Sequence, residues 1–252
     1  MRLRSVSPGL RDPPAPRLRR ASLGTSDTIS DMNVLRALST TVGSKFLVAL
    51  TGLLLVGFLV AHLAGNLLIL LGGDKFNAYG HALISNPLVI PAELGLMGLL
   101  LVHMFKAIAH VLRGRSARPE GYQKKTWAGG PSRKSWASTT MALSGIFLLA
   151  FLVVHIATFK FGPYYSSAEA GVRDLHRLVV EVFTNPLYAA GYVVAMGIVG
   201  MHLRHGISSA FQSLGLMNNS AWTTRLLGLG LTLAVVIAGG FALIPVWVYL
   251  FL

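Results

Sequence analysis

The sequence predicts an all-α integral membrane protein with five transmembrane helices, the first four of which form a two-helix repeat. Three observations support this: the composition, five long apolar runs, and a motif that occurs twice. Apolar residues make up 53% of the 252-residue chain and charged residues 12%, about half the charged share of a typical soluble domain. Each apolar run has the roughly 20 residues that a helix needs to cross the hydrocarbon core.

The composition also excludes several classes of function. The chain contains no cysteine, so it forms no disulfide and offers no thiolate to a metal ion or an iron–sulfur cluster. Its formal net charge of +13 could indicate nucleic-acid binding, but the basic residues gather between the apolar runs, as they do beside membrane spans. We therefore expect membrane lipid, and no nucleic acid, around this protein.

The first 31 residues are predicted to be a disordered basic tail or a mis-assigned extension, with Met32 as the true start. This stretch contains six arginines and four prolines and has little apolar surface to bury. Residues 32–252 are predicted to form the five-helix transmembrane domain. An interfacial amphipathic helix is expected at its beginning, over residues 32–44.

The borders of the five spans are predicted from hydropathy and from local start signals. Asn86-Pro87 precedes the second span, Asn185-Pro186 the fourth, and the polar turn Asn218-Asn219-Ser220 the fifth. The connections after the first and third spans are expected to be loops. The predicted spans cover residues 46–71, 88–112, 136–159, 187–214 and 226–251.

The charge of the connecting segments predicts the orientation of the chain in the membrane. The loop between the second and third spans carries seven basic residues and one acid, Glu120, whereas the loops after the first and third spans are near neutral. The positive-inside rule therefore places the amino terminus in the cytoplasm and the carboxyl terminus outside. We expect a multi-pass protein of the cell's inner (cytoplasmic) membrane.

A motif that ends in a histidine occurs in both the first and the third spans. Thr51-Gly52 precedes His62, and Ser144-Gly145 precedes His155, each across an apolar run. We expect the first stretch to form one wall of an outer binding site. Internal symmetry of this kind often places binding sites at the interface between the repeats.

Helix rise places the four spanning histidines at two depths. The first and third spans rise from the cytoplasmic side, and at about 1.5 Å per residue their histidines reach the outer half of the membrane. The second and fourth spans descend, and their histidines, each five residues after a Met-Gly pair, lie below the midplane. The outer level therefore pairs His62 with His155, and the inner level pairs His103 with His202.

Histidines in hydrocarbon are costly unless a ligand or a partner satisfies them. Two imidazoles per level suit the two axial positions of a haem iron, so we expect all four as iron ligands in two b haems. Alternative roles are hydrogen bonds between helices or a proton relay, but the spans hold no acid except Glu93, near a span end. Glu93 could face the outer surface or carry protons near a quinone.

Further residues are secondary candidates for binding. His110 and His205 could replace a ligand or bond to a haem propionate or a quinone carbonyl, and His81 and His176 are expected in outer loops, packed or exposed, or handling protons or quinone. Three basic residues at the inner level could neutralise propionates, although such residues also occur at helix ends for other reasons: Lys106, Arg113 and Arg204. Seven glycines could let a porphyrin or a neighbouring helix approach the backbone: Gly52, Gly57, Gly65, Gly98, Gly145, Gly197 and Gly206.

Several short motifs together resemble one known family across about residues 32–252. They are Ser44-Lys45-Phe46 before Thr51-Gly52, Phe58-x3-His62-x3-Asn66, Val102-His103, Val154-His155, and His202-Leu-x-His205-Gly206 followed by Ser209-Ala210-Phe211-Gln212-x-Leu214-Gly215-Leu216. The last motif is the most specific. The chain resembles the single-chain, five-helix cytochrome b membrane anchor of succinate:quinone oxidoreductases (succinate dehydrogenase or fumarate reductase) of the dihaem b558 type.

The resemblance implies how the cofactors are held and which partners are present. In this family the first helix pairs its ligand with the third and the second with the fourth, and the motif spacing favours His202 over His205. The implied partners are an iron–sulfur subunit and a flavoprotein on the cytoplasmic face. The resemblance leaves open whether the complex forms a higher oligomer. Electrons would pass between the iron–sulfur clusters, the inner haem, the outer haem and a menaquinone-type quinone. The glutamate that some members carry two residues before the fourth ligand is replaced by Gly200, so that proton route is not expected.

The implied role is electron transfer within the tricarboxylic acid cycle and the respiratory chain. Bis-histidine ligation fills both axial positions, so such haems carry electrons and do not bind oxygen. The succinate or fumarate chemistry would belong to a partner subunit, and no catalytic residue is assigned to this chain. The sequence predicts neither the direction of catalysis nor the position of the quinone.

Two other functions are left open by the sequence. The cytochrome b subunit of another quinone-linked respiratory oxidoreductase, of the nitrate reductase or formate dehydrogenase type, also has several spans and bis-histidine haems, but its ligands are distributed differently along the helices. A proton-coupled transporter with a histidine relay would need further buried acids and broken helices. The spans show neither.

Overall fold

The computed structural model describes residues 34–116, 140–167 and 171–252. This part of the chain is 85% helix and contains no strand, which confirms the predicted all-α class. Five of its helices are long and apolar enough to cross a membrane, as predicted. The expected tail over residues 1–31, most of the basic loop, and residues 136–139 of the third predicted span lie outside the described residues.

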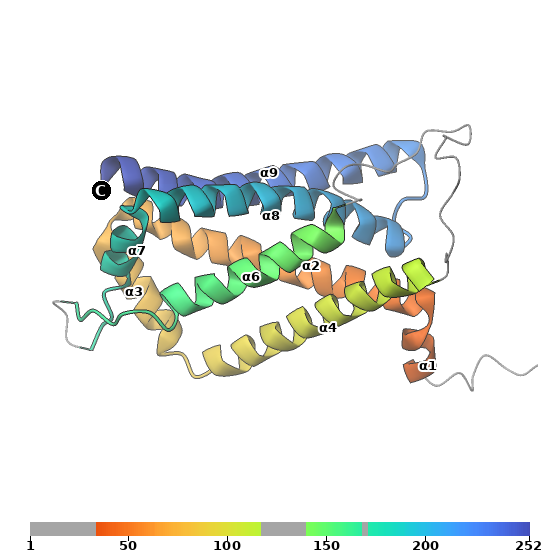
Figure 1. Ribbon diagram of the computed structural model, residues 1–252, viewed down its shortest axis with the longest axis horizontal. Coiled ribbons are helices and arrows are strands. Elements are labelled where there is room, and N and C mark those ends of the chain that lie inside the picture. Colours follow the sequence, from red (N-terminus) through yellow and green to blue (C-terminus); the bar gives the residue numbers. More distant parts are fainter. Residues whose placement is uncertain (1–33, 117–139, 168–170) are drawn as a thin grey trace, which may run out of the picture.

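The five long helices run along the length of one bundle (Figure 1). They are α2 (Thr41–Asn66) with the 3-10 turn η2 (Leu67–Leu71), α4 (Val89–Ser116), α6 (Met141–Phe159), α8 (Pro186–Ser213) and α9 (Ser220–Phe251). Three short helices complete the described fold: α1 (Val34–Ser39), α3 (Gly73–Ile84) and α7 (Leu175–Phe183). We call one end of the bundle the α1 end, and the other, where α3, α7 and the carboxyl terminus lie, the α7 end (Figure 1).

Polar side chains cap the amino-terminal ends of two long helices at the start signals found in the sequence. The Asn185 side-chain oxygen accepts a hydrogen bond from the Leu187 amide at 2.9 Å and so caps α8. Asn219 caps α9 in the same way, accepting from the Trp222 amide at 2.8 Å. These bonds satisfy amides that have no partner in a first helical turn, and each contributes about 1 kcal/mol.

The first span begins earlier than the sequence predicts. Thr40 caps α2, because its side-chain oxygen accepts from the Gly43 amide at 3.0 Å, and the helix runs from Thr41. The interfacial helix expected over residues 32–44 is therefore wrong in its extent: within the described residues it is limited to α1, and 41–44 belong to the spanning helix. Hydropathy does not reveal the position of a cap, which depends on whether one side chain reaches an amide three residues later.

The two connections predicted to be loops each contain a short helix. His81 lies on α3 and His176 on α7, so their expected loop positions are wrong. Both helices are amphipathic and bury apolar side chains at the α7 end, where Phe76 of α3 and Phe183 of α7 belong to the same core cluster as Val248 of α9. The gain from this burial favours helices over the extended loops expected from their charged residues.

A polar clasp joins α3 to α7. The buried Asn77 donates from its amide nitrogen to Asp174 Oδ1 at 2.8 Å, and its own oxygen accepts from the His176 backbone amide at 2.8 Å. Asp174 Oδ1 also accepts from the Arg177 amide at 3.0 Å and caps α7. Partial burial raises the pKa of Asp174, but the hydrogen bonds from Arg177 and Asn77 and the nearby positive charges outweigh this effect and hold the pKa below its ordinary value.

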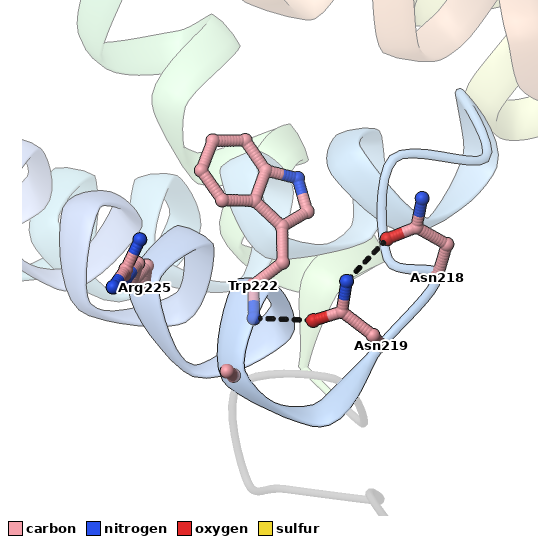
Figure 2. Close-up of a pocket in the computed structure, with 5 residues that line it drawn as sticks. Asn218, Asn219, Trp222 and Arg225 are labelled. Atoms are coloured by element: carbon pink, nitrogen blue, oxygen red, sulfur yellow. Dashed lines mark hydrogen bonds between the residues drawn. The ribbon is translucent and has the colours of Figure 1, made fainter.

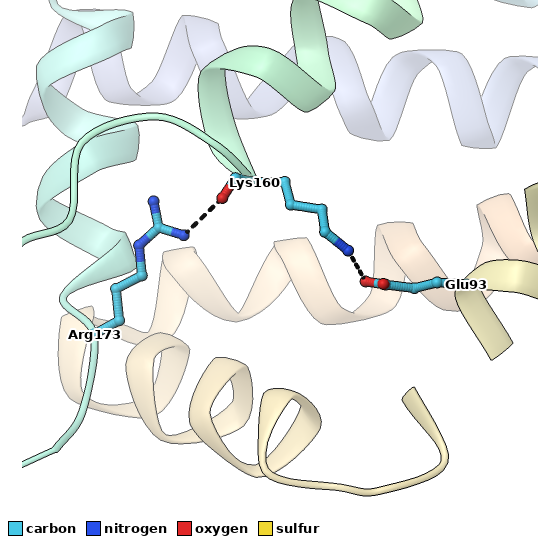
Figure 3. A network of polar contacts seen from close by, with 3 residues as sticks. All are labelled: Glu93, Lys160 and Arg173. Carbon is cyan, nitrogen blue, oxygen red and sulfur yellow. Dashed lines mark hydrogen bonds and ion pairs between the residues drawn. The ribbon is translucent and has the colours of Figure 1, made fainter. Parts of the chain in front are cut away.

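The long helices pack unevenly. The most extensive contact is between α8 and α9, where Ile207 and Ile237 are fully buried, whereas α4 packs mainly on α2 and has little contact with α6. An ion pair between Glu93 of α4 and Lys160, at the end of α6, bridges these two helices (Figure 3). The Lys160 carbonyl accepts a hydrogen bond from Arg173 at 3.4 Å. Glu93 is therefore a structural partner of Lys160 and is about half exposed.

We expect Asp174→Ala to loosen α7 by about 1 kcal/mol, the usual loss when a helix cap is removed. The hydrogen-exchange protection of the Arg177 and His176 amides measures this change. Because the folded pKa of Asp174 is lowered, its contribution is fully present above about pH 4, the unfolded value. The contribution should be lost as the pH falls through the lower folded pKa.

The control for the Asp174 experiment is Asp74→Ala, which removes an exposed acid from the first turn of α3. This change should leave exchange in α7 unaltered. Equal exchange at Arg177 and His176 in wild type and Asp174→Ala would contradict the proposed clasp.

Candidate functional site

The structure brings His62 of α2 and His155 of α6 together, toward the α7 end. Their ring centroids are 5.9 Å apart and their ring planes are nearly perpendicular, at 87°. A metal atom bonded at about 2 Å to one nitrogen of each ring, the usual imidazole bond length, would lie between rings whose centres are about 6 Å apart. The two rings, which we call the α7-end pair, are therefore spaced to share one metal atom.

Aromatic side chains from three helices surround the α7-end pair. Their ring centroids lie 5.3–5.9 Å from one of the two imidazoles. These rings come from α2, α6 and α9: Phe58, Phe151, Phe159 and Phe241. Such a lining excludes water and lowers the local dielectric constant. The energy of any charge on a bound group therefore depends strongly on the groups in direct contact with it.

The polar partners of the α7-end pair are an amide and a phenol. The Asn66 side-chain nitrogen lies 3.4 Å from both ring nitrogens of His62 and also donates to the His62 carbonyl at 2.8 Å. The Tyr192 hydroxyl lies 3.5 Å from His155 Nδ1. An amide nitrogen only donates and a phenol can donate or accept, so these neighbours do not force one tautomer on either ring.

A second pair, the α1-end pair, is formed by His103 of α4 and His202 of α8, which lie near each other. His103 Nδ1 lies 3.3 Å from Thr51 Oγ1 and 3.2 Å from the Val48 carbonyl, both on α2. His202 Nδ1 lies 3.0 Å from Ser144 Oγ on α6. The hydroxyl of each repeat therefore contacts the histidine of the following spanning helix.

This contact gives the Thr51–His62 stretch a second role beside the one expected from the sequence. Its Thr51 end contacts the α1-end pair, and its His62 end belongs to the α7-end pair. The sequence marks Thr51 and Ser144 as equivalent positions of the repeat, but it does not indicate which side chains they contact. The rotation of each helix about its axis brings these hydroxyl groups to His103 and His202.

Glycines determine how closely the rings approach the helices. A Cβ atom added to Gly52 would lie 3.0 Å from His103 Cε1, whereas one added to Gly145 would lie 3.7 Å from His202 Cε1. Gly65 is covered by the Tyr79 ring, at 2.5 Å from such a Cβ. The remaining glycines of the predicted set border open space and leave room beside the helices: Gly57, Gly98, Gly197 and Gly206.

The secondary candidates are less closely grouped. His205 is half-buried and lies near His202, whereas His110 and Arg204 are exposed and Lys106 is half-buried. In the described ranges, no three histidine or acidic side chains gather into a group that could hold a metal ion. The site therefore offers pairs of imidazoles, which suit a metal whose other ligands come from a cofactor.

Two surface hollows lie away from both pairs. One of about 370 Å³, between Asn218, Asn219, Trp222 and Arg225, lies at the turn from α8 to α9 (Figure 2). A second, of about 420 Å³, is bordered by the end of α6, by α7 and by the start of α8. None of the four paired histidines lines either hollow.

Comparison with known protein families, with curated proteins and with solved structures finds no significant match to this chain.

The spacing at the two glycines makes a comparative prediction. Gly145→Ala should be neutral or stabilising by up to about 1 kcal/mol, because alanine favours a helix and its methyl group has ordinary contact distance to His202. Gly52→Ala should be less stable than Gly145→Ala, because its methyl group presses on His103. Thermal unfolding of the two variants in the same detergent measures the difference, and equal unfolding temperatures would contradict the close packing at Gly52.

Proposed function

We propose that this chain is the dihaem cytochrome b membrane anchor of a succinate:quinone oxidoreductase. The observation that supports the proposal best is the pairing of histidines, first helix with third and second with fourth, at two levels of a five-helix bundle. This is the arrangement that the family resemblance implies. The fold alone would not support a function, because helical bundles host many.

The residues present fit two b-type haems. The donor set consists of two imidazoles per level, the ring spacing of the α7-end pair suits one shared iron, and four glycines leave room beside the spanning helices. The α7-end pair would hold one haem and the α1-end pair the other. When bound, the haems would accept and pass on single electrons.

The chain sets the distance between the two sites. On α2, Thr51 contacts His103, and His62 follows Thr51 by eleven residues. The two levels are therefore separated by about 16 Å along the helix axis. This is about half of the hydrocarbon thickness of a bilayer. The two sites would therefore lie in different halves of the membrane and connect its two faces.

The proposed orientation places the α1 end in the cytoplasm. Arg36, Lys45 and Arg113 are exposed at this end, and the basic loop follows α4, a distribution that the positive-inside rule assigns to the cytoplasmic side of an inner membrane. An iron–sulfur subunit and its flavoprotein would dock here, and a menaquinone-type quinone would be the second electron partner. The partners, not this chain, would carry out the succinate or fumarate chemistry.

One observation weakens the transporter alternative. Within the described spans, Glu93 is the only acid, and it forms an ion pair with Lys160. A proton-coupled transporter with a histidine relay would need acids that are free to exchange protons inside the membrane. Neither histidine pair has such an acid beside it among the described residues.

The haem assignment predicts the result of single substitutions. The purified wild-type chain should show b-type bands in a reduced-minus-oxidised spectrum, with two haems per chain. His103→Ala or His202→Ala should remove about half of the haem, and the remainder should stay reducible. His81→Ala and His176→Ala are matched controls on short helices and should retain both haems. Wild-type protein without b-type bands would overturn the assignment.

The partner assignment predicts which substrate reduces the haems. In native membranes succinate should reduce them, and affinity purification of the tagged chain should recover a flavin-containing subunit and an iron–sulfur subunit. Haems that are not reduced by succinate, in a chain that co-purifies with a molybdenum enzyme, would favour the nitrate reductase or formate dehydrogenase alternative.

A further inference from the structure

The hydroxyl groups of Thr51 and Ser144 have the same hydrogen-bonding pattern. The Thr51 hydroxyl donates to the Leu47 carbonyl at 2.7 Å, and the Ser144 hydroxyl donates to the Met141 carbonyl at 3.0 Å. Both side chains are buried. Because a hydroxyl has one hydrogen, a hydroxyl that donates to its own backbone meets its neighbouring histidine as an acceptor.

With the hydroxyl hydrogen on the backbone carbonyl, histidine Nδ1 carries the hydrogen in both contacts. At His103 the Val48 carbonyl also lies 3.2 Å from Nδ1, and a carbonyl can only accept a hydrogen bond. At His202 the acceptor is Ser144 Oγ, at 3.0 Å. A neutral imidazole with hydrogen on Nδ1 has its lone pair on Nε2, the nitrogen left for a metal.

We infer that Thr51 and Ser144 are positioning residues that hold His103 and His202 in the tautomer with hydrogen on Nδ1, so that Nε2 of each ring is available to the iron. The inference deepens the proposed function and rests on it for the identity of the bound group. A metal-bound histidine commonly donates its other N–H to a fixed acceptor, which orients the ring and raises its basicity as a ligand. In this chain the acceptor is supplied by the repeat motif itself.

The two levels differ in this respect. The α7-end pair has an amide donor at His62 and a phenol at His155. In the inferred tautomer, both rings of the α1-end pair donate to acceptors on α2 and α6. More basic ligands favour ferric over ferrous iron. Removing the acceptors should therefore raise the midpoint potential of the α1-end haem and leave that of the α7-end haem unchanged.

The two rings of the α1-end pair also differ from each other. His103 keeps the Val48 carbonyl as an acceptor if the Thr51 hydroxyl is removed. In the described part of the chain, Ser144 Oγ is the one hydrogen-bond partner of His202 Nδ1. We therefore expect Ser144→Ala to have a larger effect than Thr51→Val, although the two residues are equivalent in the repeat.

The test uses the full-length chain and two measurements. The first is the ¹⁵N spectrum of the imidazoles in haem-free protein in bilayers, which distinguishes protonated from unprotonated ring nitrogens. The second is a redox titration of the haem-loaded protein with both haems resolved. Ser144→Thr and Thr51→Ser are conservative variants that retain the hydroxyl. Ser208→Ala and Thr224→Val are matched controls, because each removes a hydroxyl that donates to a backbone carbonyl four residues earlier.

In wild-type protein, His103 and His202 should show a protonated Nδ1 and an unprotonated Nε2. In Ser144→Ala, His202 should populate the opposite tautomer, the α1-end haem should be retained about 10- to 100-fold less tightly, and its potential should rise. Thr51→Val should cause a smaller change, and Ser144→Thr should restore wild-type behaviour. The bands of the α7-end haem serve as the check that each variant is folded.

The outcomes separate this inference from the proposed function. Wild-type protein that binds no haem would overturn the function, while the ¹⁵N spectrum would still decide the tautomer. Wild-type protein with two haems, together with an unchanged His202 tautomer and an unchanged potential in Ser144→Ala, would overturn the inference and leave the function standing. An equal rise in Ser208→Ala and Ser144→Ala would also overturn it, because the effect would then not depend on contact with His202.

Discussion

The interaction on which the rest of this structure depends is the satisfaction of imidazoles inside a hydrocarbon layer. A polar ring in that environment is stable only if a ligand or a hydrogen bond compensates its lost hydration. Four spanning helices each place one histidine so that it faces another histidine or a polar atom of a neighbouring helix. The same contacts join α2 to α4 and to α6, and α6 to α8.

The repeated motif places equivalent polar contacts in both halves of the bundle. Each Thr-Gly or Ser-Gly pair brings a hydroxyl and an unobstructed stretch of backbone to the ring of the following helix, as Gly52 and Thr51 do for His103. On each of the two helices that carry such a pair, a histidine of the other level follows the hydroxyl residue by eleven positions: His62 after Thr51 and His155 after Ser144. Helices α2 and α6 therefore contribute to both histidine pairs. A substitution at the hydroxyl end of the motif should affect the α1-end pair, and one at the histidine end should affect the α7-end pair.

The long helices and the two levels could be predicted from the sequence because both follow from simple regularities. Hydropathy marks a span, and rise per residue converts a histidine's position into a depth. The sequence predicts a loop where α7 lies, because charged residues interrupt the apolar spacing of this segment. The structure shows a helix with four apolar residues on one face: Leu175, Leu178, Val179 and Val182. The contact between Thr51 and His103 could not be predicted, because hydropathy does not determine how far each helix is rotated about its axis.

The pairing is tested most directly by the haem content of double variants in the full-length chain. His62→Ala with His155→Ala removes both members of one proposed pair and should leave one haem per chain. His62→Ala with His103→Ala removes one member from each pair and should leave none. One haem retained in the second variant, or none in the first, would contradict the pairing of first helix with third and second with fourth.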